Sequence, residues 1–150
     1  MSDAEVGAFL DEERTVICAT NGQDGFPHLM PLWYLMRDSD LWAWTYAKSQ
    51  KVRNLERDPR ATLQVEAGSE YSELRGAMLK CDVTVHRDSA LVATFGLELF
   101  ARYRGTATAS ELDEDVQTMV RAQAPKRVVL QFSARSCATW DHRKLAAGVA

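Results

Sequence analysis

The sequence has no excess of basic residues, no long apolar run and little cysteine. Its 150 residues include 18 lysines and arginines against 21 aspartates and glutamates, a formal net charge of -3. Proteins that bind duplex nucleic acid rely on a basic excess to neutralise phosphates. No apolar run approaches the roughly 20 residues that span a bilayer, and residues 1–15 lack the basic and apolar regions of a signal peptide. We therefore expect a cytoplasmic protein that binds neither nucleic acid nor membrane.

The few cysteines exclude a disulfide or zinc framework. Cys18, Cys81 and Cys137 are odd in number and widely separated, and no two of them form a CxxC pair. We expect buried free thiols in a reducing compartment. The three histidines also lack the spacing of metal ligands, so we expect no metal site.

The chain does contain enough apolar sequence for one core. Hydrophobic residues make up 46% of it and aromatic residues 9%, at a length usual for a single domain. We expect one domain over residues 1–150, without linker or internal repeat.

Local patterns predict a short helix followed by strands. Ser2 and Glu5 have the spacing of a capping box, which predicts a helix to about residue 12. Turn sequences and β-branched or aromatic runs then predict six strands, at residues 15–20, 27–36, 41–46, 61–66, 73–86 and 127–139. Pro31 stands within the second strand, which should be bulged or lie at an edge, because proline cannot donate to a ladder.

Two longer helices are expected before the last strand. Residues 90–103 carry apolar side chains at about four-residue spacing, and Ser110 with Asp113 should cap a second helix that ends at Pro125. Short hairpins favour an antiparallel sheet, and closing it into a barrel would remove its exposed edges. The predicted fold is α+β: an antiparallel six-stranded barrel with flanking helices.

A basic connection, residues 45–63, lies between the third and fourth predicted strands. A helix starting near Ser49 would offer free backbone N–H groups and a positive dipole end to a phosphate. Lys51 would add its ammonium from a solvent-filled groove, while Val52 and Leu55 would dock on the barrel. The alternative is a solvated basic face. The aromatic interleaving of a nucleic-acid patch is absent.

Four segments carry a resemblance that covers nearly the whole chain: DGFPHLMPLWY (24–34), SQKVRNLERDPRATL (49–63), YSELRGAM (71–78) and TWDHRKL (139–145). In order and spacing they resemble the pyridoxamine 5′-phosphate oxidase-like, flavin-binding split β-barrels. Within that family the chain is most similar to the flavin/deazaflavin oxidoreductase B group, which uses coenzyme F-420. The resemblance implies a homodimer with the cofactor in a groove between the two chains.

The resemblance also implies the residues that bind the cofactor. Residues of the 27–36 strand would line the ring, those of the 41–46 strand would reach its pyrimidine side and polyol chain, and residues 49–51 would hold the phosphate. The partner chain would complete the pocket with Trp140, and His142 or Arg143 beside it. The full set is His28, Pro31, Leu32, Trp33, Trp44, Thr45, Ser49, Gln50, Lys51, Tyr71 and Trp140.

Several of these positions have structural alternatives. Trp42 and Trp44 share one face of a strand, so at least one could belong to the core. Gly76 could mark a bend. Arg75 could bind the ligand or pair with Glu73, and the sequence does not choose between them.

No residue has the surroundings of a nucleophile or dedicated base, so the cofactor would carry the chemistry. The resemblance implies an F-420-dependent oxidoreductase that transfers a hydride between the reduced deazaflavin and a small unsaturated molecule of the quinone, enone or tetrapyrrole type. An FMN-dependent oxidase or reductase, or a non-enzymatic flavin or deazaflavin carrier, are the alternatives. FMN sites of this family tend to carry more arginine and lysine than Ser49-Gln50-Lys51, which favours F-420.

Overall fold

The computed structural model describes residues 1–146. The helices are α1 (Asp3–Glu12), α2 (Gln50–Arg57), α3 (Ser89–Arg104), α4 (Glu114–Gln123) and α5 (Arg143–Ala146). The strands are β1 (Val16–Asn21), β2 (Pro27–Leu32), β3 (Leu35–Arg37), β4 (Asp40–Tyr46), β5 (Arg60–Ala67), β6 (Arg75–His86) and β7 (Arg127–Asp141). Within residues 1–146, no helix is both long enough and apolar enough to cross a membrane.

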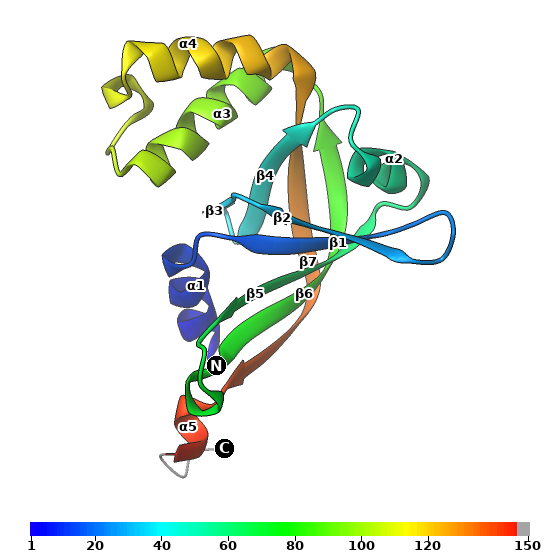
Figure 1. Cartoon of the computed structure of the whole chain (residues 1–150), viewed down its shortest axis with the longest axis vertical. Coiled ribbons are helices and arrows are strands. Elements are labelled where there is room, and N and C mark those ends of the chain that lie inside the picture. Colours follow the sequence, from blue (N-terminus) through cyan, green and yellow to red (C-terminus); the bar gives the residue numbers. More distant parts are fainter. Residues whose placement is uncertain (147–150) are drawn as a thin grey trace.

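The strands form one antiparallel sheet in the order β2-β1-β5-β6-β7-β4-β3. Its two edges, β2 and β3, are consecutive in the sequence and only Trp33 and Tyr34 separate them. The sheet must therefore curl round until its edges meet, and it does so without closing the ladder, as Figure 1 shows. This arrangement confirms the α+β antiparallel split barrel.

The strand count differs from the prediction, because the expected strand over residues 27–36 is two strands. At the break, Tyr34 is fully buried and its hydroxyl donates to the Leu10 carbonyl at 2.6 Å. Its backbone N–H and C=O bind the side chains of Tyr103 and Arg102 rather than a neighbouring strand. The expectation for Pro31 is confirmed, since β2 lies at an edge of the sheet, where it pairs with β1.

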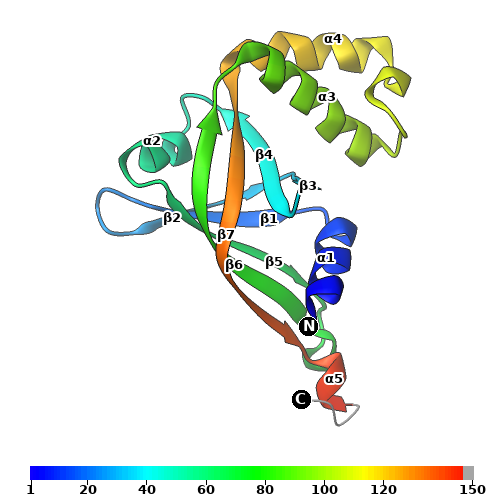
Figure 2. The same cartoon turned by 180° about the vertical axis from the view of Figure 1, so that it is seen from behind.

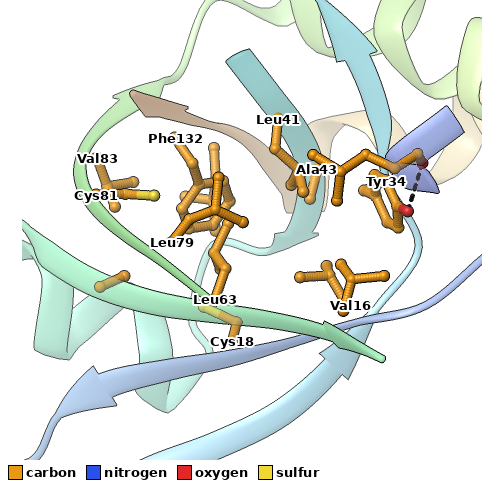
Figure 3. Packing of buried hydrophobic residues seen from close by; sticks show 14 of the residues in the cluster. Val16, Cys18, Tyr34, Leu41, Ala43, Leu63, Leu79, Cys81, Val83 and Phe132 are labelled. Atoms are coloured by element: carbon orange, nitrogen blue, oxygen red, sulfur yellow. Dashed lines mark hydrogen bonds between the residues drawn. The ribbon is translucent and has the colours of Figure 1, made fainter. Parts of the chain in front are cut away.

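Apolar side chains form two cores on the two faces of the sheet. The larger core fills the barrel, and Figure 3 shows Val16, Leu63, Leu79 and Phe132 pointing into it. The second lies between the outer face of β4 and β7 and the helices α3 and α4, which form a separate layer at one end in Figures 1 and 2. Strand alternation places side chains of β4 in both cores.

The helix starts follow local hydrogen bonding. Ser2 and Glu5 form the predicted capping box at α1. The predicted start of the second long helix near Ser110 is wrong, because α4 begins at Glu114. Residues Ala109–Glu111 instead form a separate 3-10 turn, in which the Glu111 carboxylate accepts a hydrogen bond from the Ala107 N–H.

The expectation of buried thiols is correct for two of the three cysteines. Cys18 and Cys81 are buried in the barrel, whereas Cys137 is exposed. A β-bulge between β6 and β7 adds one residue to β7, so that Cys137 pairs with Leu79 on the inward face. The Cys137 side chain is nevertheless exposed, although its partner Leu79 belongs to the barrel core.

Candidate functional site

The basic connection forms α2, with Ser49 as its N-cap and with Val52 and Leu55 buried against the barrel, as predicted. The Ser49 hydroxyl does not cap its own helix. Its Oγ atom is buried and has no hydrogen-bond partner in the described part of the chain. A buried polar atom without a partner carries a free-energy cost of about 1–3 kcal/mol, which a bound ligand could remove.

The Lys51 side chain turns inward beneath α2, and the expectation that it faces a solvent-filled groove is wrong. It is 5% exposed, and its Nζ atom donates to the Thr45 Oγ1 at 2.8 Å. Burial lowers the pKa of Lys51; the nearby Cys18 opposes this shift and the charge of Arg127 adds to it. Among residues 1–146 no carboxylate forms a salt bridge with Lys51. Lys51 is therefore a buried basic group with no acidic partner among the described residues.

A second cation that the sequence analysis missed, Arg127, stands at the start of β7. It pairs in register with Tyr46, whose carbonyl accepts the N–H of Ser49 at 3.1 Å. The guanidinium lies 3.7 Å from the Tyr46 ring centroid, and its buried Nε has no partner among the described residues. Burial lowers the pKa of Arg127 as well. The pairing of β4 with β7 brings this side chain close to α2. Local sequence does not predict that pairing. We call Ser49, Lys51, Arg127 and the N-terminus of α2 the α2 corner.

Two predicted residues from separate segments line one cavity beside this corner. The cavity, of about 420 Å³, lies between the β1–β2 loop and α2, with His28 on one wall and Gln50 on the other. The His28 Nδ1 is buried without a partner in residues 1–146. Gln50 donates to Asn54 at 2.9 Å, and Asn54 donates to Thr20 at 3.1 Å. These bonds fix the α2 wall of the cavity.

The remaining predicted residues of β2 lie along its exposed edge. Pro31 is exposed and Leu32 is half-buried against the barrel core. Trp33 is 45% exposed and stacks on Tyr103, with ring centroids 4.2 Å apart. Leu29 is also exposed, at 58%, so this edge offers an apolar surface next to the cavity.

Trp44 does not join these residues through its side chain. Its ring is 7% exposed and belongs to the core beneath α3 and α4, together with Trp42. Helix α3 packs so closely there that a Cβ on Gly96 would lie 2.4 Å from the Trp44 ring. Both tryptophans are therefore core residues. Thr45, which points the other way, holds Lys51.

Tyr71 and Trp140 lie at the far end of β5, β6 and β7, which we call the tip. Tyr71 is 74% exposed, and its carbonyl oxygen lies 2.8 Å from the His142 Nδ1. Trp140 pairs with Gly76 in the β6–β7 ladder, and its indole packs closely against that glycine, since a Cβ there would lie 2.3 Å from the ring. Gly76 thus permits close packing of Trp140.

The polar residues of the tip have partners within the chain. Arg75 contacts Glu12 at the end of α1 and the following Glu13, at 3.6 and 3.9 Å, rather than Glu73. Arg143 forms an ion pair with Asp141 at 2.7 Å. Neither arginine is directed to the α2 corner.

The tip and the α2 corner are far apart within one chain. They lie at opposite ends of β7, which has 15 residues. At about 3.3 Å per residue this is a path of roughly 45 Å along the strand. Figures 1 and 2 show α5, next to the tip, at the lower end of the molecule and α2 in its upper half. One chain therefore does not bring Tyr71 or Trp140 to Ser49 and Lys51.

A larger cavity, of about 740 Å³, lies on the outer face of the sheet, and none of the predicted residues lines it. Its lining residues are Ala19, Asn21, Pro27, Leu29, Arg60, Ala61, Thr62, Lys80, Cys81 and Arg135. Arg60 and Arg135 are already paired with Asp58 and Asp82.

The chain is similar to proteins of one family. Residues 2–141 match the family described as pyridoxamine 5′-phosphate oxidase. A conserved hypothetical protein from Mycobacterium tuberculosis shares 37% identity, over 97% of this chain and 88% of that one, with a TM-score of 0.86. No protein of curated function matches.

Two solved structures with lower identity share the fold. An F-420 reductase is 22% identical over 87% of this chain and 94% of its own, with a TM-score of 0.66. A FAD-binding protein from Mesorhizobium loti is 17% identical over 93% and 94%, with a TM-score of 0.68.

Proposed function

Because the chain belongs to the pyridoxamine 5′-phosphate oxidase family, we propose that it is a coenzyme F-420-dependent oxidoreductase. Its substrate would be a small unsaturated molecule of the quinone, enone or tetrapyrrole type. The observation that carries the proposal is the α2 corner, where the buried Lys51 ammonium has no acidic partner in residues 1–146. Structures that share this fold include an F-420 reductase and a FAD-binding protein, which supports a cofactor of the flavin type.

The donors of the α2 corner fit a phosphate group. Ser49 Oγ and Arg127 Nε are buried without acceptors, and the Lys51 ammonium binds a neutral hydroxyl. The first turn of α2 adds free backbone N–H groups and the positive end of the helix dipole. A phosphate at the start of α2 would accept a hydrogen bond from the Ser49 hydroxyl and would supply the negative charge that Lys51 lacks among residues 1–146. Arg127 packs on the Trp44 ring, on the opposite side of β4 from Thr45, and would add its positive charge to the corner. His28 and Gln50 would then contact the part of the cofactor that enters the neighbouring cavity.

Protein groups in this site bind and orient, whereas the deazaflavin supplies the hydride when it is bound. Pro31 and Leu32 at the end of β2, together with Trp33 that follows them, would cover the ring and exclude water from the reacting face. We assign no catalytic acid or base to a side chain.

A second copy of the chain would complete the site. Tyr71 and Trp140 lie at the tip, roughly 45 Å along β7 from the α2 corner, and this separation supports a role in which they cover the cofactor of a partner chain. The proposed assembly is a homodimer in which each tip closes the partner's site.

Titrating the purified protein with F-420 and with FMN, followed by absorbance and fluorescence, tests the proposal. We expect F-420 to bind more tightly, and we expect the reduced F-420 to be oxidised when a quinone or enone is added. Tighter binding of FMN would identify the FMN-dependent alternative. Tight binding of F-420 without oxidation by any acceptor would identify a carrier. The Lys51→Met variant is the control, since it removes the ammonium and keeps the length of the side chain.

A further inference from the structure

Trp33 is the large exposed residue at the point where the two edges of the sheet meet. It lies between β2 and β3 and is 45% exposed. Despite this exposure, two rings of α3 restrict its side chain. Tyr103 stacks on it at 4.2 Å with an interplanar angle of 10°, and Phe100 meets it edge-on at 5.5 Å.

The Tyr103 hydroxyl also binds the backbone next to Trp33. It accepts the Tyr34 N–H at 3.0 Å and lies 2.5 Å from the Arg14 carbonyl, to which it donates. Burial raises the pKa of Tyr103, so the hydroxyl keeps the proton that this second bond needs. One side chain therefore restrains both the Trp33 ring and the backbone that follows it.

Arg102 ties the same connection to α1. Its Nη1 donates to the Tyr34 carbonyl at 2.9 Å, and its Nη2 donates to the carbonyls of Asp11 and Glu13, both at 2.8 Å. Within the described residues no carboxylate forms a salt bridge with Arg102. Its guanidinium instead donates to three main-chain carbonyl oxygens in two segments of the chain. A guanidinium can do so because it carries five N–H donors. We call Arg102 and Tyr103 the α3 clamp.

We propose that the α3 clamp consists of positioning residues that hold Trp33 in the orientation in which it meets the cofactor ring. The clamp acts at the two-residue connection, Trp33 and Tyr34, that joins the two edge strands of the split barrel, so it restrains β2 relative to β3. A ring that is already immobilised loses less conformational entropy on binding. The contact between Trp33 and the cofactor rests on the proposed function, whereas the immobilisation of Trp33 does not.

A double-mutant cycle between Trp33 and Tyr103 tests the clamp. Trp33→Ala and Tyr103→Leu should each raise the dissociation constant for F-420 about tenfold, and the double variant should bind no more weakly than Trp33→Ala alone, because contacting residues couple. If the increases in the dissociation constant from the two single variants multiply in the double variant, the proposal is overturned. Tyr103→Leu would then weaken binding whether or not Trp33 is present, as a general disturbance of the fold would. Arg104→Gln, an exposed neighbour on α3, is the matched control and should leave the constant unchanged.

Acrylamide quenching separates the clamp from the proposed function. The contribution of Trp33 to the fluorescence is the part of the tryptophan emission that is lost in Trp33→Phe. Acrylamide should quench this part more strongly in Arg102→Gln and Tyr103→Leu than in Arg104→Gln. Unchanged accessibility would overturn the clamp even if F-420 binds. A wild-type protein that binds neither F-420 nor FMN would overturn the proposed function alone. If Tyr103→Leu does not fold, Tyr103→Phe keeps the stacked ring and loses only the hydroxyl, and quenching in that variant should still rise.

Discussion

Among single residues, Lys51 has the surroundings that most strongly constrain what the protein can bind. Burial lowers its pKa below the ordinary value of 10.5. Between the folded pKa and 10.5 the unfolded chain therefore binds more protons than the folded chain, so the stability contribution of Lys51 rises with pH across that window. Below the window the folded protein holds a buried charge at a cost to its stability. An anion bound at the α2 corner would offset that cost. Its binding requires the protonated, positively charged form of Lys51.

Lys51→Met should reveal both effects. We expect the affinity for the phosphate-bearing cofactor to fall by about 1.5–3 kcal/mol, the range for a hydrogen bond to a charged group, while the free energy of unfolding at neutral pH stays equal or rises. In the wild type, affinity should decline as the pH rises through the lowered pKa of Lys51, and in the variant this decline should be absent. Titrations and urea unfolding at several pH values measure both. An unchanged affinity would remove Lys51 from the site.

At the scale of elements, β6 and β7 make one very close contact at the tip. The Trp140 indole occupies the space above Gly76, and the Val65 carbonyl lies 2.8 Å from the position that a Cβ on Gly76 would take. The Val65 oxygen belongs to the backbone of β5 and cannot move away cheaply. The absence of a side chain at position 76 therefore lets Trp140 lie across the sheet.

Gly76→Ala should lower the free energy of unfolding by about 1–3 kcal/mol, because overpacking forces side chains and backbone to shift. Gly7→Ala is the matched control. A Cβ on Gly7 meets no atom within 4 Å, and alanine inside α1 should stabilise the protein by about 0.5–1 kcal/mol. Chemical denaturation of both variants measures the difference. Equal stabilities would mean that the Trp140 ring does not rest on position 76.

At the scale of the whole molecule, the separation of the tip from the α2 corner decides how a complete site can form. Tyr71 at the tip is exposed, as are Leu29 on the edge strand β2 and Trp33 after the end of β2 that is remote from α2. A homodimer that buries them should have an interface above the roughly 1,000 Å² that distinguishes biological contacts from crystal contacts.

Mixing two defective variants tests this assembly. Lys51→Met impairs the α2 corner and Trp140→Ala impairs the tip, so each homodimer should bind the cofactor weakly. A mixed dimer contains one site built from the intact corner of one chain and the intact tip of the other, and that site should recover wild-type affinity. Titration after subunit exchange measures the recovered fraction. A protein that is monomeric by light scattering at micromolar concentration while it binds cofactor would contradict the dimer, as would the absence of any recovery.

The sequence by itself determined those features that depend on neighbours along the chain. The capping box at Ser2, the α2 helix after Ser49 and the edge position of the strand that contains Pro31 each follow from hydrogen-bonding chemistry within a few residues. The antiparallel orientation of the strands, though not their order in the sheet, followed from the short hairpins, and the four segments of resemblance identified the family that residues 2–141 match.

Only the tertiary structure decided where distant side chains meet. Arg127 reaches the α2 corner through the register of β4 with β7, and Cys137 takes its face from a bulge in β7. Tyr34 ends β2 because α1 and α3 bind its polar groups, and Lys51 is buried because Thr45 of β4 lies beneath α2. The physical reason is common to all four: each outcome depends on contacts between segments far apart in the chain, and a local pattern of residues holds no information about which segments will pack together.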